Sequence, residues 1–429
     1  MKTNSGPFID AISSPSFSLL LLVLPAFTVL LDETLYYTVS LVAPIYGLVL
    51  YVFLSSWHDN PVSPSAWMSL FLYPLLSPLF SLKIAPHLPI PPSLRCYFCG
   101  LTSVALAWNT YATVVVGPRP DLSCLSGQGL RGRKYLVTGG SAGIGMATVE
   151  LLVRLDATVV VLVRNTGKME GAEREVWKKV ENWRAGRGLR GRGDGKIVIV
   201  QCDLCSLASV REAGSIVRKD HPDIECLVLN AGVMFPNKVE TEDGLDGMMT
   251  ANHLGHFVLV KELVGNLTKS QDGGRIVLLT SSTHHMAKNG LLVDDLNCLS
   301  RPYTLFGQYS QSKICNIILA KELVKRYPSL FTAAVHPGVV RTDVVRNLPP
   351  FIKALNTLFG FVMWSLQKTP VEGSYTTLHC CVVRRDRAGN GAYWANCTEC
   401  KANKWADEEG VGERLWEESE KLTGGGKKQ

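Results

Sequence analysis

A glycine-rich turn between an apolar segment and a helix-forming segment constrains the fold of this 429-residue chain most strongly. Residues 134–155 read KYLVTGGSAGIGMATVELLVRL, and a second apolar run, ATVVVLVR, follows directly. A buried strand, a turn containing Gly139, Gly143 and Gly145, a helix and a second strand are typical of a Rossmann-type sheet. Glycines let the backbone approach a pyrophosphate, and the helix N-terminus offers it unpaired N–H groups. The sequence therefore predicts a doubly wound parallel α/β fold that binds a dinucleotide.

The first part of the chain has a different composition. Acidic and basic residues are rare from Ala11 to about Pro118 and reach ordinary globular density from Arg119 onward. A helix needs roughly 20 apolar residues to cross a bilayer. Four stretches without Asp, Glu, Lys or Arg are about that long or longer, namely 11–31, 34–57, 60–82 and 96–118. Three or four transmembrane helices are expected, because the four prolines of the third stretch also allow a re-entrant or interfacial segment.

This asymmetry predicts the domain organisation. We expect a membrane-anchoring region at 1–118, a linker at 119–131 and an α/β domain at 132–425. If the chain crosses the membrane four times, Lys2 and the basic residues just after the last segment favour a cytosolic α/β domain. Lys83 and Arg95 would then lie on the opposite side, which argues against that orientation.

The end of the second predicted strand bears on the type of dinucleotide. An acidic residue there binds the ribose 2′-hydroxyl of NAD, whereas a basic residue accommodates the 2′-phosphate of NADP. The chain has Arg164 at this point and no acid. The sequence therefore favours NADP(H), and the alternative is that Arg164 is an ordinary surface charge.

A tyrosine and a lysine share one face of a later predicted helix. In YSQSK, Tyr309 and Lys313 are four residues apart on a helix that runs to about Tyr327. Reduction of a carbonyl needs a proton donor at the developing alkoxide, and oxidation needs the same group as a base. A neighbouring ammonium stabilises a phenolate and lowers the pKa of the phenol. Upstream, the apolar strand GRIVLLTSS ends in Ser281 and Ser282, whose hydroxyls are candidates to hold the substrate oxygen.

Together these motifs resemble the short-chain dehydrogenase/reductase family, from about Lys134 to about Gly424. The resemblance implies a catalytic tetrad of Asn252, Ser282, Tyr309 and Lys313, with Ser281 as the alternative serine and Asn252 holding a water. Asp203 would lie beside the adenine, or would simply cap the helix that follows. The expected cofactor contacts are Gly139, Ser141, Gly143, Ile144, Gly145, Arg164, Asp203, Leu204, Asn230, Ala231, Gly232, Tyr309, Lys313, Pro337, Gly338 and Thr342. Ala142 departs from the basic residue that many NADP-dependent members carry there.

Finer motifs resemble the retinol dehydrogenase-like branch, including its X-linked dehydrogenase/reductase relative. They are NAGVM, NHLGHF, the two histidines after the serine pair, HPGVVRTDV and KTPVEGSYT. The branch implies oxidoreductases of the endoplasmic reticulum membrane that act on lipophilic alcohols and their aldehydes or ketones, such as retinoids, polyprenols or steroids. The segment 349–367 is apolar on most faces, as expected of a substrate-covering or interfacial helix. A helix buried against the sheet is the alternative, and a non-catalytic membrane scaffold is the alternative function.

Charge and cysteine content bear on other classes of partner. The net charge is +7, and the densest basic cluster is Arg184–Lys196, which we interpret as a solvated loop rather than a phosphate-binding surface. Few aromatic residues interleave with this cluster, so nucleic acid is not an expected partner. The C-x-x-C pairs are expected to be free thiols and no metal is expected, although Cys397 and Cys400 leave that question open. A homo-oligomer is compatible with the sequence.

Overall fold

The computed structural model describes residues 117–341, apart from 124, 126–128 and 271–272, and residues 367–424. Almost all of them belong to one compact unit, Pro118–Gln429. The four expected membrane segments, apart from the last two residues of the fourth, lie outside the described residues, as does most of the apolar segment 349–367. Within the described ranges, no helix is both long and apolar enough to cross a bilayer.

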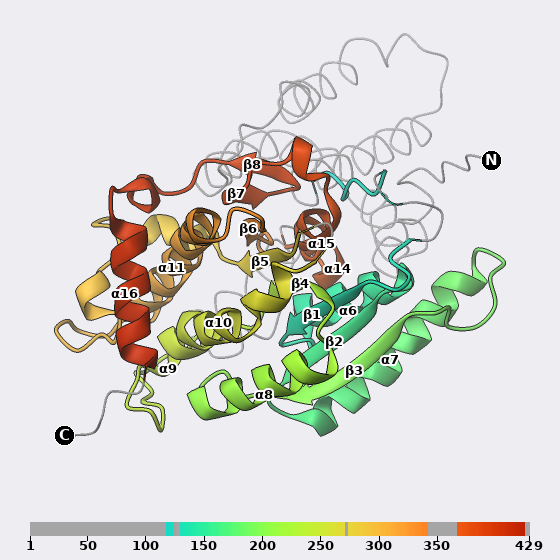
Figure 1. Ribbon diagram of the computed structural model, residues 1–429, viewed down its shortest axis with the longest axis horizontal. Coiled ribbons are helices and arrows are strands. Elements are labelled where there is room, and N and C mark those ends of the chain that lie inside the picture. The colour runs from blue at the N-terminus through green and yellow to red at the C-terminus, as the bar shows by residue number, and fades with distance from the viewer. Residues whose placement is uncertain (1–116, 124, 126–128, 271–272, 342–366, 425–429) are drawn as a thin grey trace, which may run out of the picture. The chain divides into compact units, whose positions relative to one another are not determined.

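A single sheet organises this unit, and its strands run in the order β3-β2-β1-β4-β5-β6-β7-β8 (Figure 1). All neighbouring pairs are parallel except β7 and β8, which are antiparallel. The strands are β1 (Lys134–Thr138), β2 (Thr158–Val163), β3 (Lys196–Gln201), β4 (Ile224–Leu229), β5 (Arg275–Leu279), β6 (Phe331–His336), β7 (Ala392–Ala395) and β8 (Thr398–Cys400). The strand order reverses between β1 and β4, which confirms the expected Rossmann-type α/β sheet and marks the usual position of a ligand crevice.

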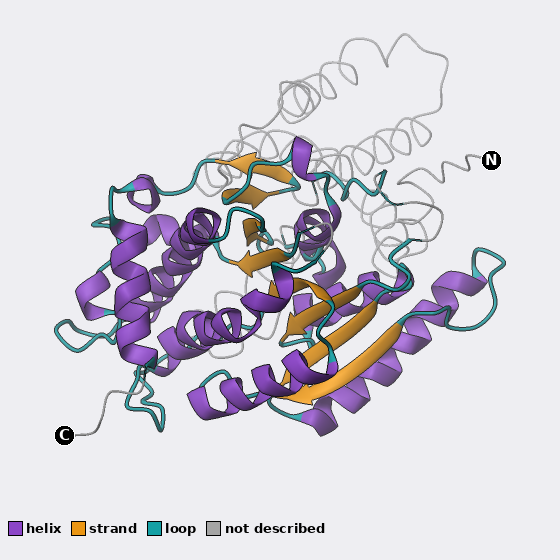
Figure 2. Cartoon of the chain, in the orientation of Figure 1, coloured by secondary structure: helices purple, strands orange, loops and turns teal. Residues whose placement is uncertain are grey.

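Helices cover both faces of the sheet (Figure 2). One face packs against α6 (Gly143–Arg154), α7 (Thr166–Ala185) and α15 (Tyr375–Val382), and the other against α8 (Leu207–Asp220), α10 (Gly255–Leu267), α11 (Leu305–Arg326) and α16 (Val411–Thr423). Successive strand residues point to opposite faces of the sheet. Tyr135 and Val137 therefore belong to the core under α6, α7 and α15, and Leu136 belongs to the core under α8, α10, α11 and α16. Because both faces are buried there, central strands such as β2 and β5 are apolar runs after their first residue.

Short helices complete the connections. They are α9 (Gly247–Met249), η3 (Thr250–Leu254), η4 (Ser282–Met286), η5 (Val293–Asp295), α14 (Pro370–Gly373), η7 (Arg385–Arg387) and η8 (Lys404–Asp407). The basic cluster lies at the end of α7 and in the exposed loop before β3, where the Arg187 guanidinium stacks on Trp183 at 4.3 Å and Arg192 pairs with Glu181.

The cysteine pair that the sequence left open lies in a tight hairpin. Asn396 and Cys397 form the two-residue turn between β7 and β8, with φ of +51° and +54°, as such turns require. The Cys397 backbone N–H donates to Thr376, and Cys400 lies in β8. In the part of the chain that the structure describes, no group of three His, Cys, Asp or Glu side chains is placed to hold a metal ion.

Candidate active site

The turn between β1 and α6 has the backbone that its glycines predict. Gly139 and Gly143 have φ of +70° and +54°, in the left-handed region that favours glycine. A side chain at Gly145 would place its Cβ only 2.3 Å from the Gly139 carbonyl oxygen and 2.5 Å from Nδ2 of Asn230. This packing lets the turn lie directly over the ends of β1 and β4.

The start of α6 suits an anionic ligand. Its N-cap residue, Ala142, makes no side-chain hydrogen bond to the helix, and the first turn contains no acidic residue. The first N–H groups of a helix lack intrahelical partners and carry partial positive charge. Ser141 and Ile144 are both partly exposed beside them. The residues present therefore fit a dinucleotide pyrophosphate at this position.

The N-A-G segment after β4 connects this turn to the rest of the site. The Thr138 hydroxyl accepts the backbone N–H groups of Asn230 at 2.9 Å and Ala231 at 3.0 Å. A Cβ at Gly232 would lie 3.2 Å from Nζ of Lys313 and 3.4 Å from Oδ1 of Asn252. The glycine thus leaves room for two of the predicted tetrad residues.

The ends of β2 and β3 lie at the same edge of the sheet. Arg164 is exposed just before α7, and it forms no ion pair with the acids of the described ranges. Asp203 accepts the Cys205 N–H at 2.9 Å, but it does not cap the next helix, because that position belongs to Ser206. The neighbouring Leu204 is partly buried, and its carbonyl packs closely against Gly255.

Tyr309 and Lys313 meet the end of β5 from α11. The Ser281 side chain lies close enough to the Tyr309 phenol to lower its pKa. Nζ of Lys313 lies 5.4 Å from the centre of the Tyr309 ring and donates to the Leu279 carbonyl at 3.3 Å. Part of Tyr309 remains accessible, but the surrounding protein desolvates the phenol and raises its pKa to about 12, an effect that the nearby Ser281 side chain opposes. Burial lowers the pKa of Lys313 to about 8.

The two serines after β5 have different surroundings. Ser281 is still extended, with φ of −154° and ψ of 152°, and its hydroxyl accepts the Thr283 N–H at the start of η4. The same side chain is near enough to Tyr309 to affect the pKa of the phenol. Ser282 is the first residue of η4, and its N–H donates to His336. The structure thus relates Ser281 to Tyr309, whereas the resemblance assigns the catalytic role to Ser282, and that assignment stays a prediction.

Asn252 lies at the centre of a one-turn π-helix, η3, between α9 and α10. Its side chain accepts the Val233 N–H at 2.7 Å and donates to the Ser312 hydroxyl at 3.0 Å. The backbone carbonyl of Asn252 accepts a hydrogen bond from the Asn316 side-chain amide at 3.2 Å. Short π-helices occur frequently at functional sites. This one joins Asn252 to the segment after β4 and to the helix that carries Tyr309.

The P-G motif follows β6 and holds a residue that the sequence did not single out. Gly338 has φ of +86°, and a Cβ there would lie 2.8 Å from Cε of Lys368. Lys368 is only 2% exposed, and its ammonium donates to Asn396 at 2.7 Å. Its backbone also pairs with Val339 and Arg341. Lys368 therefore fixes the P-G turn where the chain leaves for residues 342–366, a range that places Thr342 outside the described residues.

A single sequence gives only a weak signal for Lys368. It begins KTPVEGSYT, a motif that marks the branch, but nothing in that pattern indicates that the lysine is buried. Asp246 was also missed. It is 1% exposed, accepts from the Met249 backbone at 2.8 Å and from Gln308 at 2.9 Å, and so ties α9 to the start of α11.

Comparisons with known proteins agree with this geometry. A family model described as short chain dehydrogenase matches residues 133–293. Retinol dehydrogenase 14 of Mus musculus is 33% identical over 297 residues, which cover 69% of this chain and 87% of the relative. Polyprenol dehydrogenase of Homo sapiens is 30% identical, with 72% and 87% covered. A crystal structure of an uncharacterized protein from Mycobacterium paratuberculosis superposes with a TM-score of 0.52 at 26% identity, covering 69% of this chain and 95% of that one.

The chain thus belongs to the short-chain dehydrogenase/reductase family. Within that family, its relatives place it in the retinol dehydrogenase-like branch.

Replacing Lys313 by methionine should stabilise the fold at neutral pH. A lysine whose pKa falls from 10.5 unfolded to about 8 folded costs about 3 kcal/mol below pH 8, since each pKa unit is worth about 1.4 kcal/mol. That cost disappears as the pH rises from 8 to 10.5, where only the unfolded chain holds the proton. In urea unfolding, the free energy of unfolding of Lys313→Met should therefore exceed that of wild type at pH 7. This difference should disappear by about pH 10.

The matched control is Lys325→Met, on the same helix but with a 71% exposed side chain. Its effect should stay small and independent of pH in this range. If the difference in unfolding free energy between Lys313→Met and wild type does not change with pH, the result would contradict the assigned burial of the Lys313 ammonium.

Proposed function

We propose that this chain is an NADP-dependent oxidoreductase that interconverts a lipophilic alcohol and its aldehyde or ketone, with Tyr309 as general acid and base. The observation that carries the proposal is the contact of Ser281 with Tyr309 beside the Lys313 ammonium. These groups lie at the carboxyl ends of the strands, at the same edge as the glycine-rich turn. Bound NADPH would supply the hydride.

Each side chain has a distinct role in this proposal. Ser281 donates a hydrogen bond to the substrate oxygen and holds it against Tyr309. Tyr309 gives its proton to the forming alkoxide in reduction and takes it back in oxidation. Lys313 stabilises the phenolate electrostatically, an effect that is strong in a desolvated site. Asn252 fixes η3 against the segment after β4, and it positions a water that connects Lys313 to solvent.

The same edge supports the proposed cofactor contacts. Gly139, Gly143 and Gly145, with Ser141 and Ile144, would hold the pyrophosphate at the start of α6. Arg164 would face the 2′-phosphate, since it is exposed and no acid of the described ranges neutralises it. Around these, the proposed adenine and nicotinamide contacts are Asp203, Leu204, Asn230, Ala231, Gly232, Pro337, Gly338 and Thr342.

The substrate class and the membrane rest on the relatives and on the sequence. The relatives are named for retinol and polyprenol, which are lipophilic alcohols. The charge-free stretches support an anchor at 1–118, followed by a linker at 119–131 and a catalytic domain at 132–425. We infer that the anchor and the apolar segment 349–367 let a lipid substrate enter from the bilayer, with the catalytic domain on the cytosolic face of the endoplasmic reticulum.

The two serines give the sharpest test of the catalytic assignment. With NADPH and a lipophilic aldehyde, Ser281→Ala and Tyr309→Phe should each lower kcat at least 100-fold, because each removes a group that contacts the reacting oxygen. Ser282→Ala is the matched control and should retain activity within about threefold of wild type. A larger loss from Ser282→Ala than from Ser281→Ala would restore the original assignment. No turnover by wild type with any aldehyde would favour a non-catalytic scaffold.

The cofactor assignment depends on Arg164. Loss of one charge-assisted contact costs about 1.5–3 kcal/mol, so Arg164→Ala should raise the KM for NADPH roughly 10- to 100-fold while leaving that for NADH unchanged. Arg174→Ala removes an exposed arginine further along α7 and should change neither value. Steady-state assays with both cofactors side by side provide the measurement. If Arg164→Ala raised the KM for NADPH and for NADH equally, Arg164 would not contact the 2′-phosphate.

A further inference from the structure

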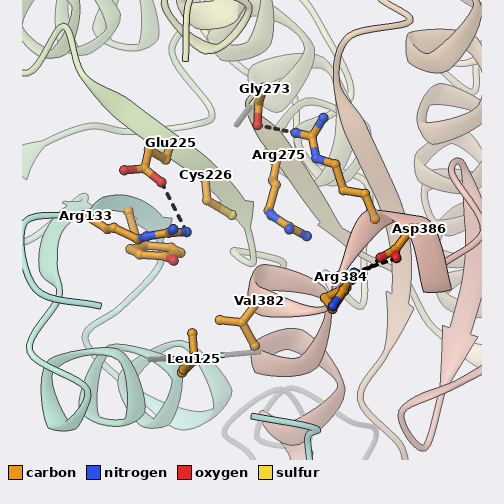
Figure 3. Close-up of a pocket in the computed structure, with 11 residues that line it drawn as sticks. Leu125, Arg133, Glu225, Cys226, Gly273, Arg275, Val382, Arg384 and Asp386 are labelled. Carbon is orange, nitrogen blue, oxygen red and sulfur yellow. Dashed lines mark hydrogen bonds and ion pairs between the residues drawn. The ribbon is translucent and has the colours of Figure 1, made fainter. Parts of the chain in front are cut away.

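A polar cavity lies at the opposite edge of the sheet from the candidate active site. It has a volume of about 310 Å³ and is lined by residues where β1, β4 and β5 begin and where α15 ends (Figure 3). Ligand pockets in proteins start at about this size, roughly 300 Å³. In a parallel sheet the strand starts and strand ends lie at opposite edges, so the proposed cofactor and catalytic groups take no part in it.

Arginines dominate the charged lining of this cavity. Four arginines line it, Arg133, Arg275, Arg384 and Arg385, against two described carboxylates, Glu225 and Asp386. Arg384 forms a two-point contact with Asp386 at 3.0 and 2.8 Å, whereas Arg133 lies 3.6 Å from Glu225. Among the described lining residues, the positive charges therefore exceed the negative ones by two.

Arg275 is held in place by neutral groups. Its guanidinium donates to the Cys380 carbonyl at 3.2 Å and to the Val383 carbonyl at 2.8 Å, and it lies 5.1 Å from the centre of the Phe331 ring. These contacts fix the side chain but leave its charge uncompensated by a carboxylate. Two of the five N–H donors of an arginine are used in this way, so the others are available to an anion.

The view of the cavity shows how the charges are arranged. The Arg275 side chain lies between Arg133 on one side and Arg384 on the other, and Val382 and Leu125 border the same space (Figure 3). Buried Tyr135 and Cys226 complete the lining. Rigid guanidinium groups around a small space match the geometry of phosphate oxygens.

We propose that this cavity binds a phosphate group. The phosphate belongs either to a free phosphorylated molecule or to the headgroup of an anionic phospholipid, and both offer the same oxygens to the arginines. Leu125 follows the proposed end of the membrane anchor by only seven residues. Seven residues span at most about 25 Å, so a lipid headgroup beside the anchor is within reach, and anionic headgroups attract basic surfaces.

The test is calorimetric titration of the full chain in a neutral detergent with inorganic phosphate, with saturating NADP⁺ present to fill the cofactor's own phosphate sites. Wild type should bind phosphate saturably. Arg384→Gln should weaken binding at least fivefold, and Asp386→Asn should tighten it at least twofold, because it removes a competing carboxylate. Arg387→Gln is the matched control, since this exposed arginine lies three residues beyond Arg384, at the end of η7, but does not line the cavity. It should change binding less than twofold.

Mixed micelles separate the two sources of phosphate. Tighter binding of phosphatidic acid than of inorganic phosphate, with none for phosphatidylcholine, would assign the site to a headgroup, and equal binding would assign it to free phosphate. Absence of saturable phosphate binding, or an equal loss in Arg387→Gln and Arg384→Gln, would overturn the proposal. If Arg384→Gln does not fold, the Asp386→Asn result decides. NADPH turnover should stay within twofold in all three variants, so this outcome is independent of the proposed catalytic function.

Discussion

Parallel pairing of β1, β4, β5 and β6 is the constraint on which the candidate site depends. Parallel strands all end at one edge of the sheet. Strand pairing alone therefore brings together residues that are up to two hundred positions apart in the sequence. Gly139 follows β1, Asn230 follows β4, Ser281 lies just beyond β5 and Pro337 follows β6. The Thr138 hydroxyl then joins the first two of these segments through two backbone N–H groups.

The site also requires polar groups in an apolar interior. Lys313 is 3% exposed, and burial favours its neutral form. Asn252 and Asp246 are equally buried, but their hydrogen bonds connect η3, α9 and α11. These bonds hold α11, the helix that carries Tyr309, against η3 and α9. Part of the stability of the apolar core is therefore offset by groups that the proposed chemistry uses, as is common at catalytic sites.

The sequence predicted the fold because its local signals agree with its global pattern. Continuous apolar runs, a glycine turn and amphipathic segments at regular spacing all indicate one parallel sheet. The same signals predicted Tyr309, Lys313 and Asn252 as site residues, because their motifs have fixed spacing. The choice of Ser282 over Ser281 came from the resemblance alone, because the position of each hydroxyl depends on where an extended segment turns into η4. The local signals also missed Lys368, since burial against Gly338 is a contact between distant segments and leaves no local pattern.

The central claim is that Ser281, Tyr309 and Lys313 serve hydride transfer to a lipophilic carbonyl. The most direct measurement offers the full chain in detergent a long isoprenoid aldehyde and a short soluble aldehyde together with NADPH deuterated at C4, and analyses the alcohols by mass spectrometry. The account predicts one deuterium in the isoprenoid alcohol, far less labelled short alcohol, and no labelled product with Tyr309→Phe. Equal labelling of both alcohols would contradict the lipid preference, and labelling that persists unchanged in Tyr309→Phe would contradict the site itself.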